Sequence, residues 1–282
     1  MRTRTTVTAL AAAAAVALAP ATAASADPGK GGGKPANPNH TVGLAGGGTE
    51  IVTFHADKPR NLRVVGDVTG LQEDTRLVGI DFRVQDGQLY GVGDRGGVYT
   101  IDTRSGAATL VLRLTVALEG ERFGVDFNPA ANALRIVSDT GQNLRQPFAT
   151  PGAATIEDGD LSTPPAAGTT TGVTAAAYTN NDLDDSTATS LFVISGSSVA
   201  LQSPANAGTL AATGSLGVEV TGDAGFDIRS TRKGGKTVEN EAYATITVGG
   251  QARLFQVSLL TGAAQEVGTL AADVTDLALP LG

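Results

Sequence analysis

The 282-residue chain contains no cysteine and no tryptophan, and it has only two histidines. The lack of cysteine excludes disulfides, thiolate metal sites and cysteine nucleophiles. Aromatic residues make up only 4 % of the sequence, so a core must be built mainly from Val, Leu, Ile, Ala and a few Phe. The net charge of −8 argues against binding to nucleic acid or to an anionic membrane through bulk charge.

The first 26 residues have the pattern of a secretory signal peptide. Arg2 and Arg4 give a basic start, residues 7–18 form an apolar Ala-rich run, and Ala24-Ser25-Ala26 is a small-residue cleavage site. A membrane anchor is the alternative, but the run is short for a bilayer span. We therefore predict a signal peptide over 1–26, a secreted extracellular protein, and no membrane association after cleavage. Residues 27–40 are rich in Gly and Pro and predict a flexible tail.

Residues 77–111 predict four short strands separated by turn residues. The strand segments are GIDF, QLYGVG, VYTID and AATLV, and apolar and polar residues roughly alternate within them. Similar units begin near Gly124, Val173 and Gly225. The positions matched in the first strand of each unit are Asp81, Asp126, Ala175, Asp227 and Asp276. Their steps of 45, 49, 52 and 49 residues are typical of propeller blades.

The two ends of the repeat array complement each other. Residues 41–71 resemble the second, third and fourth strands of a unit, whereas residues 274–279 resemble a first strand alone. We therefore predict an all-β domain over 41–282, a five-bladed β-propeller of four-stranded antiparallel blades. The C-terminal strand would close the ring by joining the N-terminal blade, which also hides sheet edges. An open two-sheet sandwich would leave the repeat unexplained.

Several segments carry a resemblance to a known family. They are LVGIDF, DGQLYGVG, YTIDTRSGAATLV, FGVDFNPAANALRIVSDTGQNLR, GVEVTGDAGFDI and VTDLAL. In these segments the chain resembles the secreted family called domain of unknown function 4394 (DUF4394), over about residues 42–280. SDTGQNLR and the preceding DFNP are the most specific part. The resemblance implies a repetitive propeller-like domain outside the cytoplasm, and it implies no activity and no catalytic residue.

Two motifs that suggest chemistry have simpler explanations. Residues 91–96 spell G-x-G-x-x-G, but a strand follows instead of the helix that a dinucleotide site requires, which favours a hairpin turn. His40 falls in the predicted tail and His55 in a strand, so neither a serine triad nor a histidine metal site is favoured.

Two charged segments are predicted to be solvated turns. The acidic loop, Asn180–Asp185, lacks the Gly and the distal Glu of an EF-hand, which leaves adventitious calcium as its alternative. The basic hairpin, Arg229–Lys236, could instead bind an anionic polymer.

The strongest functional signal is the set of aspartates in the first strands, Asp81, Asp126, Asp227 and Asp276. Because first strands surround the channel of a propeller, these side chains are expected in one layer. Each carboxylate could accept hydrogen bonds from the neighbouring blade and so join blade to blade. The alternative is a cation site for calcium or magnesium, the only cofactors that the sequence suggests.

Otherwise no nucleophile, no acid–base pair of side chains and no metal cluster stands out, so no catalytic residue is predicted. We predict a monomeric binding or interaction module that takes an extracellular ligand or polymer on its rim loops or channel. The alternative is a carboxylate- or cation-dependent hydrolase or lyase acting on sugars or lactones, a hypothesis that rests on fold analogy alone.

Overall fold

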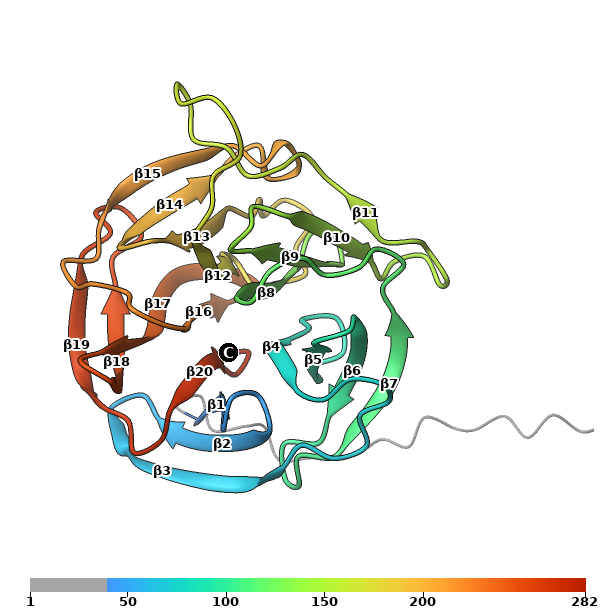
Figure 1. The fold of residues 1–282 in the computed structure, drawn as a ribbon, viewed down its shortest axis with the longest axis vertical. Helices are drawn as coiled ribbons and strands as arrows, with labels where there is room; N and C mark the ends of the chain where they lie inside the picture. The colour runs from blue at the N-terminus through green and yellow to red at the C-terminus, as the bar shows by residue number, and fades with distance from the viewer. Residues whose placement is uncertain (1–39) are drawn as a thin grey trace, which may run out of the picture. The chain divides into compact units, whose positions relative to one another are not determined.

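The computed structural model describes residues 40–282, and the predicted signal peptide and all but the last residue of the predicted tail lie outside the described residues. Residues 40–282 form five four-stranded antiparallel sheets arranged as the blades of a ring (Figure 1). Among these residues no helix is long and apolar enough to cross a membrane. The five-bladed propeller predicted from the repeat is confirmed.

The blades are numbered from the N-terminus, and each is given from its inner to its outer strand. Blade 1 contains β20 (Val274–Ala278), β1 (His40–Ala45), β2 (Glu50–His55) and β3 (Lys58–Asp67). Blade 2 contains β4 (Leu77–Phe82), β5 (Leu89–Gly93), β6 (Gly97–Ile101) and β7 (Ala108–Arg113). Blade 3 contains β8 (Phe123–Asn128), β9 (Ala133–Ser138), β10 (Asn143–Pro147) and β11 (Ile156–Glu157).

The remaining two blades have the same order. Blade 4 contains β12 (Val173–Tyr178), β13 (Leu191–Ser195), β14 (Ser198–Gln202) and β15 (Leu210–Ser215). Blade 5 contains β16 (Ala224–Lys233), β17 (Lys236–Val248), β18 (Gln251–Val257) and β19 (Ala264–Thr269). A single 3₁₀ turn, Ala205–Ala207, is the only helical element of the described chain.

The ring is closed by the C-terminal strand, as the sequence predicts. β20 pairs antiparallel with β1, so Leu277 lies opposite Gly43 although the two residues stand at opposite ends of the domain. The inner strands β4, β8, β12, β16 and β20 each contact the next one round the ring, including β20 with β4. Closure therefore gives every inner strand two neighbouring blades.

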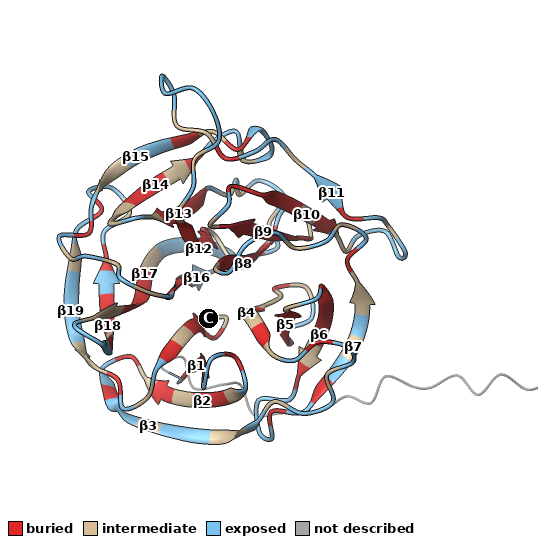
Figure 2. Ribbon diagram, in the orientation of Figure 1, coloured by how far each residue is buried: buried red, intermediate tan, exposed pale blue. Residues whose placement is uncertain are grey.

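The core is divided among the five junctions between blades. Each junction holds one cluster of buried apolar side chains, contributed by the two sheets on either side. Between blades 1 and 2, for example, Leu44 and Ile51 pack with Leu77 and Ile80. Each blade takes part in two junctions, so removal of one blade would expose two clusters. The loss would be large, because burying each such side chain contributes about 1.5–3 kcal/mol. Figure 2 shows buried residues on the inner strands and exposed ones on the outer strands.

The connections between strands define two ends of the ring. At one end lie the links between first and second strands and between third and fourth strands. We call this the loop end, and it comprises residues 56–57, 83–88, 102–107, 129–132, 148–155, 179–190, 203–209, 234–235 and 258–263. The inner strands finish at this end. β1 begins there, at His40, so this residue belongs to a strand and not to the predicted tail.

Candidate functional site

Strand register corrects the alignment of the first strands. Asp81, Asp126 and Asp227 lie opposite Tyr90, Arg135 and Tyr243 of the second strands. The corresponding residue of blade 4 is Ala177, opposite Phe192, and that of blade 1 is Ala278, opposite Val42. The sequence alignment, which put Ala175 and Asp276 at this place, is therefore wrong by two residues. A shift of two keeps every side chain on the same face, so alternation could not reveal it.

Ala175 and Asp276 occupy the position that glycine takes in the other three blades. These glycines are Gly79, Gly124 and Gly225. A Cβ on Gly124 would lie 2.4 Å from the Ala176 nitrogen, and one on Gly225 would lie 2.5 Å from the Asp276 Cα. Glycine two residues before each Asp thus lets neighbouring inner strands approach closely.

All four aspartates accept hydrogen bonds from the next blade. In each case the donor is the backbone N–H of the residue that comes directly after the equivalent position in the next blade. The bonds are Phe127 N to Asp81 Oδ2 (2.8 Å), Tyr178 N to Asp126 Oδ1 (3.1 Å), Leu279 N to Asp227 Oδ2 (2.5 Å) and Ile80 N to Asp276 Oδ2 (2.8 Å). The carboxylates therefore connect the blades through backbone groups.

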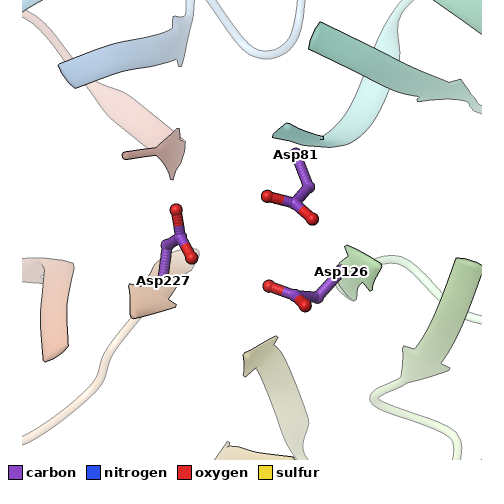
Figure 3. A group of neighbouring side chains, drawn as sticks. All are labelled: Asp81, Asp126 and Asp227. Atoms are coloured by element: carbon purple, nitrogen blue, oxygen red, sulfur yellow. The ribbon is translucent and has the colours of Figure 1, made fainter. Parts of the chain in front are cut away.

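Three of the aspartates converge at the centre of the ring and form what we call the carboxylate triad: Asp81, Asp126 and Asp227. One carboxylate oxygen from each lies within 4.8 Å of the others. Figure 3 shows the three side chains pointing toward one another from separate blades. Asp276 is not part of this group, because its position lies two residues earlier in the strand. The predicted layer of four is therefore a group of three with one aspartate beside it.

Burial of the triad raises the pKa of each carboxyl. The three side chains are between 2 % and 5 % exposed. Burial raises the pKa of Asp81 and Asp126 well above the ordinary value, and nearby carboxylates, among them Asp227 and Asp276, raise it further. Burial raises the pKa of Asp227 to about 7. Burial likewise raises the pKa of Asp276. Three carboxylates so placed cannot all ionise at neutral pH without compensation.

No basic side chain compensates the triad among residues 40–282. Arg135 lies directly opposite Asp126 in the sheet, but its guanidinium donates to Asp158 and Asn143 instead. No ion pair of the described chain involves a triad carboxylate. Asp126 accepts one hydrogen bond, on Oδ1, and no described group donates to its Oδ2. The triad therefore presents uncompensated oxygen donors, the ligand type that calcium and magnesium prefer.

A cleft lies over the loop end of blades 2, 3 and 4. Its volume is about 290 Å³, and it is lined mostly by polar residues of three loops: Gln85, Pro129, Ala130, Asn132, Asn180, Asp182, Leu183, Asp184, Asp185, Thr187 and Thr189. Gln85 donates from Nε2 to the Pro129 carbonyl, while its buried Oε1 has no donor in the described structure. Gln85 therefore links the loops of blades 2 and 3 that line the cleft, and its buried Oε1 is out of reach of a ligand.

A larger cleft of about 760 Å³ lies between blades 4 and 5, also at the loop end. Its walls include Phe192, Glu239 and Glu241, and Leu260 is 86 % exposed at its edge. Glu241 pairs with Arg229. Sequence reasoning did not find this cleft, because its walls come from two blades.

The two charged segments contact each other, contrary to the expectation of separate solvated turns. The basic hairpin is an extension of β16 and β17 around a Gly234-Gly235 turn. Lys236 Nζ lies 3.2 Å from Asp184 Oδ2, and Asp182 Oδ2 accepts the Thr237 N–H at 2.8 Å. Asp182 is only 3 % exposed. The acidic loop is therefore held against blade 5 by these contacts.

The remaining motifs behave as follows. The G-x-G-x-x-G segment forms the hairpin between β5 and β6, as predicted. The two histidines, which the sequence places in unrelated segments, lie directly opposite each other in β1 and β2. Their Nε2 atoms are 3.1 Å apart. The sequence indicated that these two strands pair, but it did not fix their register, so the contact between the histidines could not be predicted.

Comparisons with known proteins match the chain to solved structures and to one family. The chain is similar to a solved structure described as "Crystal structure of Nidogen/Laminin Complex", with a TM-score of 0.50 and 8 % identity, covering 86 % of this chain and 98 % of that chain. A structure of Kuenenia stuttgartiensis hydrazine synthase matches with a TM-score of 0.40 and 10 % identity over 72 % of this chain and 52 % of that chain. No curated protein matches. A family model described as Domain of unknown function (DUF4394) matches residues 50–278, and the chain belongs to this family.

Proposed function

We propose that this protein is a secreted, monomeric and non-catalytic binding module that takes an extracellular ligand at the loop end of the ring. The observation that carries the proposal is that three pockets open at this one end. The cleft over blades 2, 3 and 4 is walled by connections, and the other two pockets are walled by strand ends and the adjoining connections, which differ in length and sequence from blade to blade. Variable loops on a rigid repeated scaffold are a common arrangement for ligand binding.

The cleft over blades 2, 3 and 4 suits a ligand rich in hydroxyl groups. Asn132, Asn180 and Thr187 are partly exposed and offer neutral donors and acceptors. A sugar hydroxyl can both donate to and accept from amide and hydroxyl groups of this kind. We therefore infer that an extracellular polysaccharide is the ligand class.

The triad supports the scaffold rather than the ligand in this proposal. Calcium or magnesium bound by Asp81, Asp126 and Asp227 would compensate three buried charges and tie blades 2, 3 and 5 together. Oxygens within 4.8 Å of one another can share one calcium ion, since Ca–O distances are about 2.3–2.6 Å.

A cation-dependent hydrolase or lyase on sugars or lactones is the second candidate. Carboxyls with raised pKa, as in the triad, are the groups that serve as general acids in such enzymes. However, a side chain that is at most 5 % exposed cannot touch a polymer chain outside the ring. For this reason the binding module is the better-supported function.

The test is to incubate the purified protein with a panel of insoluble polysaccharides and to measure both retention and new reducing ends. We expect retention without product. Gln85→Ala should weaken retention at least several-fold, whereas Gln88→Ala, an exposed residue of the same loop, should not. Product formation that Asp227→Asn abolishes would favour the enzyme, and no retention on any polymer would overturn the ligand class.

Secretion has its own test, because it concerns residues outside the described part of the chain. The intact mass of protein recovered from the medium should correspond to a chain that begins at Asp27. A secreted form that retains residues 9–19 would contradict the proposed cleavage.

A further inference from the structure

Blade 1 carries a pocket whose ionisable walls are all basic. Its volume is about 530 Å³, and its lining is His40, Thr53, Phe54, His55, Lys58, Asn61 and Arg63. No carboxylate lines it, although the whole chain has a net charge of −8. A concave basic site on an acidic protein differs from a scattered set of solvated lysines, because its charges face one volume.

The pocket results from an irregularity in the pairing of β2 with β3. Thr53 lies opposite Arg63 and His55 lies opposite Lys58, so Phe54 alone faces the four residues 59–62. The extra residues of β3 bulge away from β2 and leave a hollow with the buried Phe54 in its wall. The two cations are thereby placed at opposite ends of one bulge.

These cations have no carboxylate partner in the part of the chain that the structure describes. Neither Lys58 nor Arg63 makes an ion pair with any residue of 40–282, and both are exposed. By contrast, Arg83, Arg145 and Arg253 each pair with a carboxylate. An exposed guanidinium and ammonium at one hollow supply a bidentate donor and a point charge, the combination that recognises an oxyanion.

The histidine pair completes the wall from a second direction. His40 Nε2 and His55 Nε2 are 3.1 Å apart, and their ring centroids are 4.4 Å apart, so the Nε2 edges face each other. At this distance one nitrogen must donate and the other accept. An acceptor placed between the rings could instead take an N–H from each of them. An oxyanion is such an acceptor.

We propose that this pocket binds a tetrahedral oxyanion, a sulfate or phosphate group that is either free or carried on a polymer. His40, His55, Lys58 and Arg63 are its donors, and the Asn61 amide is a further one. The inference rests on the proposed function only in placing a ligand at the loop end, since none of these residues belongs to the cleft over blades 2, 3 and 4 or to the triad.

A transition metal on the histidine pair is the competing occupant. Two imidazole nitrogens 3.1 Å apart could share a zinc ion at about 2.0–2.1 Å from each. Lys58 lies opposite His55 in the sheet, however, and Arg63 lines the same hollow. Two adjacent positive charges oppose a second cation and favour an anion.

The experiment uses the two histidines as reporters, because the chain has no others. Sodium sulfate and then inorganic phosphate are titrated into the full mature protein at constant ionic strength and pH, and the histidine ring NMR signals are followed. We expect both signals to shift saturably with the same midpoint. Lys58→Gln and Arg63→Gln should each weaken binding about tenfold, whereas Arg104→Gln, an exposed arginine of blade 2, should not.

Three further arms fix the interpretation. Dextran sulfate should compete with free sulfate, and dextran should not. A lower midpoint for dextran sulfate than for free sulfate, per sulfate group, would indicate a polymer-borne group, and equal midpoints would indicate a free ion. Asp126→Asn and Gln85→Ala should leave the sulfate midpoint unchanged, so the loss of polysaccharide binding and the loss of sulfate binding are distinguishable. Absence of a saturable shift, equal loss in Arg104→Gln, or a response to zinc without one to sulfate would overturn the proposal.

Discussion

Two of the places where this ring buries charged side chains compensate the charge in opposite ways. At the junction of blades 3 and 4, Arg135 is 1 % exposed, and its guanidinium donates to Asp158 at 2.8 Å and to Asn143 and Asn206 at 2.7 Å. At the centre of the ring, the triad brings three carboxylates together with no basic partner in the described chain.

The two places show that basic partners can reverse the pKa shift that burial causes, and that without them burial decides its direction. Burial acts to raise the pKa of Asp158, yet hydrogen bonds from Arg145 and Arg135 hold it below the ordinary value. In the triad, burial raises the pKa and nearby carboxylates add to the effect. The charge of Asp158 is compensated by arginines of the chain itself, whereas the charges of the triad must be compensated by protons or by a cation.

The largest expected effect comes from breaking the complete arrangement. Arg135→Met should lower the free energy of unfolding by about 3–5 kcal/mol, because it removes three buried hydrogen bonds of a charged donor, to Asp158, Asn143 and Asn206. Asp158 then keeps only its bonds from the more exposed Arg145. Arg145→Met is the matched control, since Arg145 also contacts Asp158 but is 28 % exposed, and should cost about 1 kcal/mol or less. Urea unfolding at pH 7 measures both, and equal losses would contradict the distinction.

The next effect is a pH dependence carried by the triad. Because the folded-state pKa values are raised, the folded protein holds protons more tightly than the unfolded chain. In chelator, stability should therefore be greatest near pH 4 and fall as pH rises toward and through about 7. A change in Asp227 from 3.8 to about 7 corresponds to a loss of the order of 4 kcal/mol. Asp158, with its lowered pKa, acts oppositely and loses its contribution only as pH falls below about 4.

Asp126→Asn is the variant that tests this dependence cleanly. Its amide oxygen can keep the bond from Tyr178 N–H, since only Oδ1 of Asp126 accepts one, whereas both oxygens of Asp227 accept backbone N–H groups. The variant should lose less stability between pH 4 and pH 8 and should exceed the wild type at pH 8. Parallel pH curves in urea titrations would show that the triad does not control this region.

Cation binding should give a smaller effect of opposite sign at pH 8. Calcium or magnesium at about one hundred times its Kd would add about 2.7 kcal/mol of stability. We expect the melting temperature to rise with calcium, to fall with chelator, and to respond less in Asp126→Asn. A melting temperature that is the same in calcium, magnesium and chelator would leave the carboxylates as links between blades only.

The smallest effect is expected at the fourth aspartate. Asp276→Asn keeps an acceptor for the Ile80 N–H, and at pH 4, where the buried carboxyl with its raised pKa is protonated, stability should change by less than about 1 kcal/mol. The calcium response should be unchanged. If thermal melts of this variant lost that response, the layer of four that the sequence predicts would describe the cation site better than the triad does.

The amino-acid sequence by itself determined the blade, the number of blades and the closure of the ring. Alternation within segments such as LVGIDF and turn residues between them are local properties, and the unpaired first strand at 274–279 has one place to go. The aspartates were predicted to surround the channel for the same reason, because a repeated position in a first strand must face the centre of a propeller.

Only the tertiary structure decided which of these residues meet. A strand repeats its faces every two residues, so a slip of two that exchanges Ala175 for Ala177 leaves the sequence pattern intact. Arg135 could be recognised as buried only once the 3₁₀ turn of blade 4 supplied Asn206, and the histidines met only through the pairing of β1 with β2. Side chains from distant segments are brought together by register and by packing between sheets, and neither is encoded in the local alternation of a single strand.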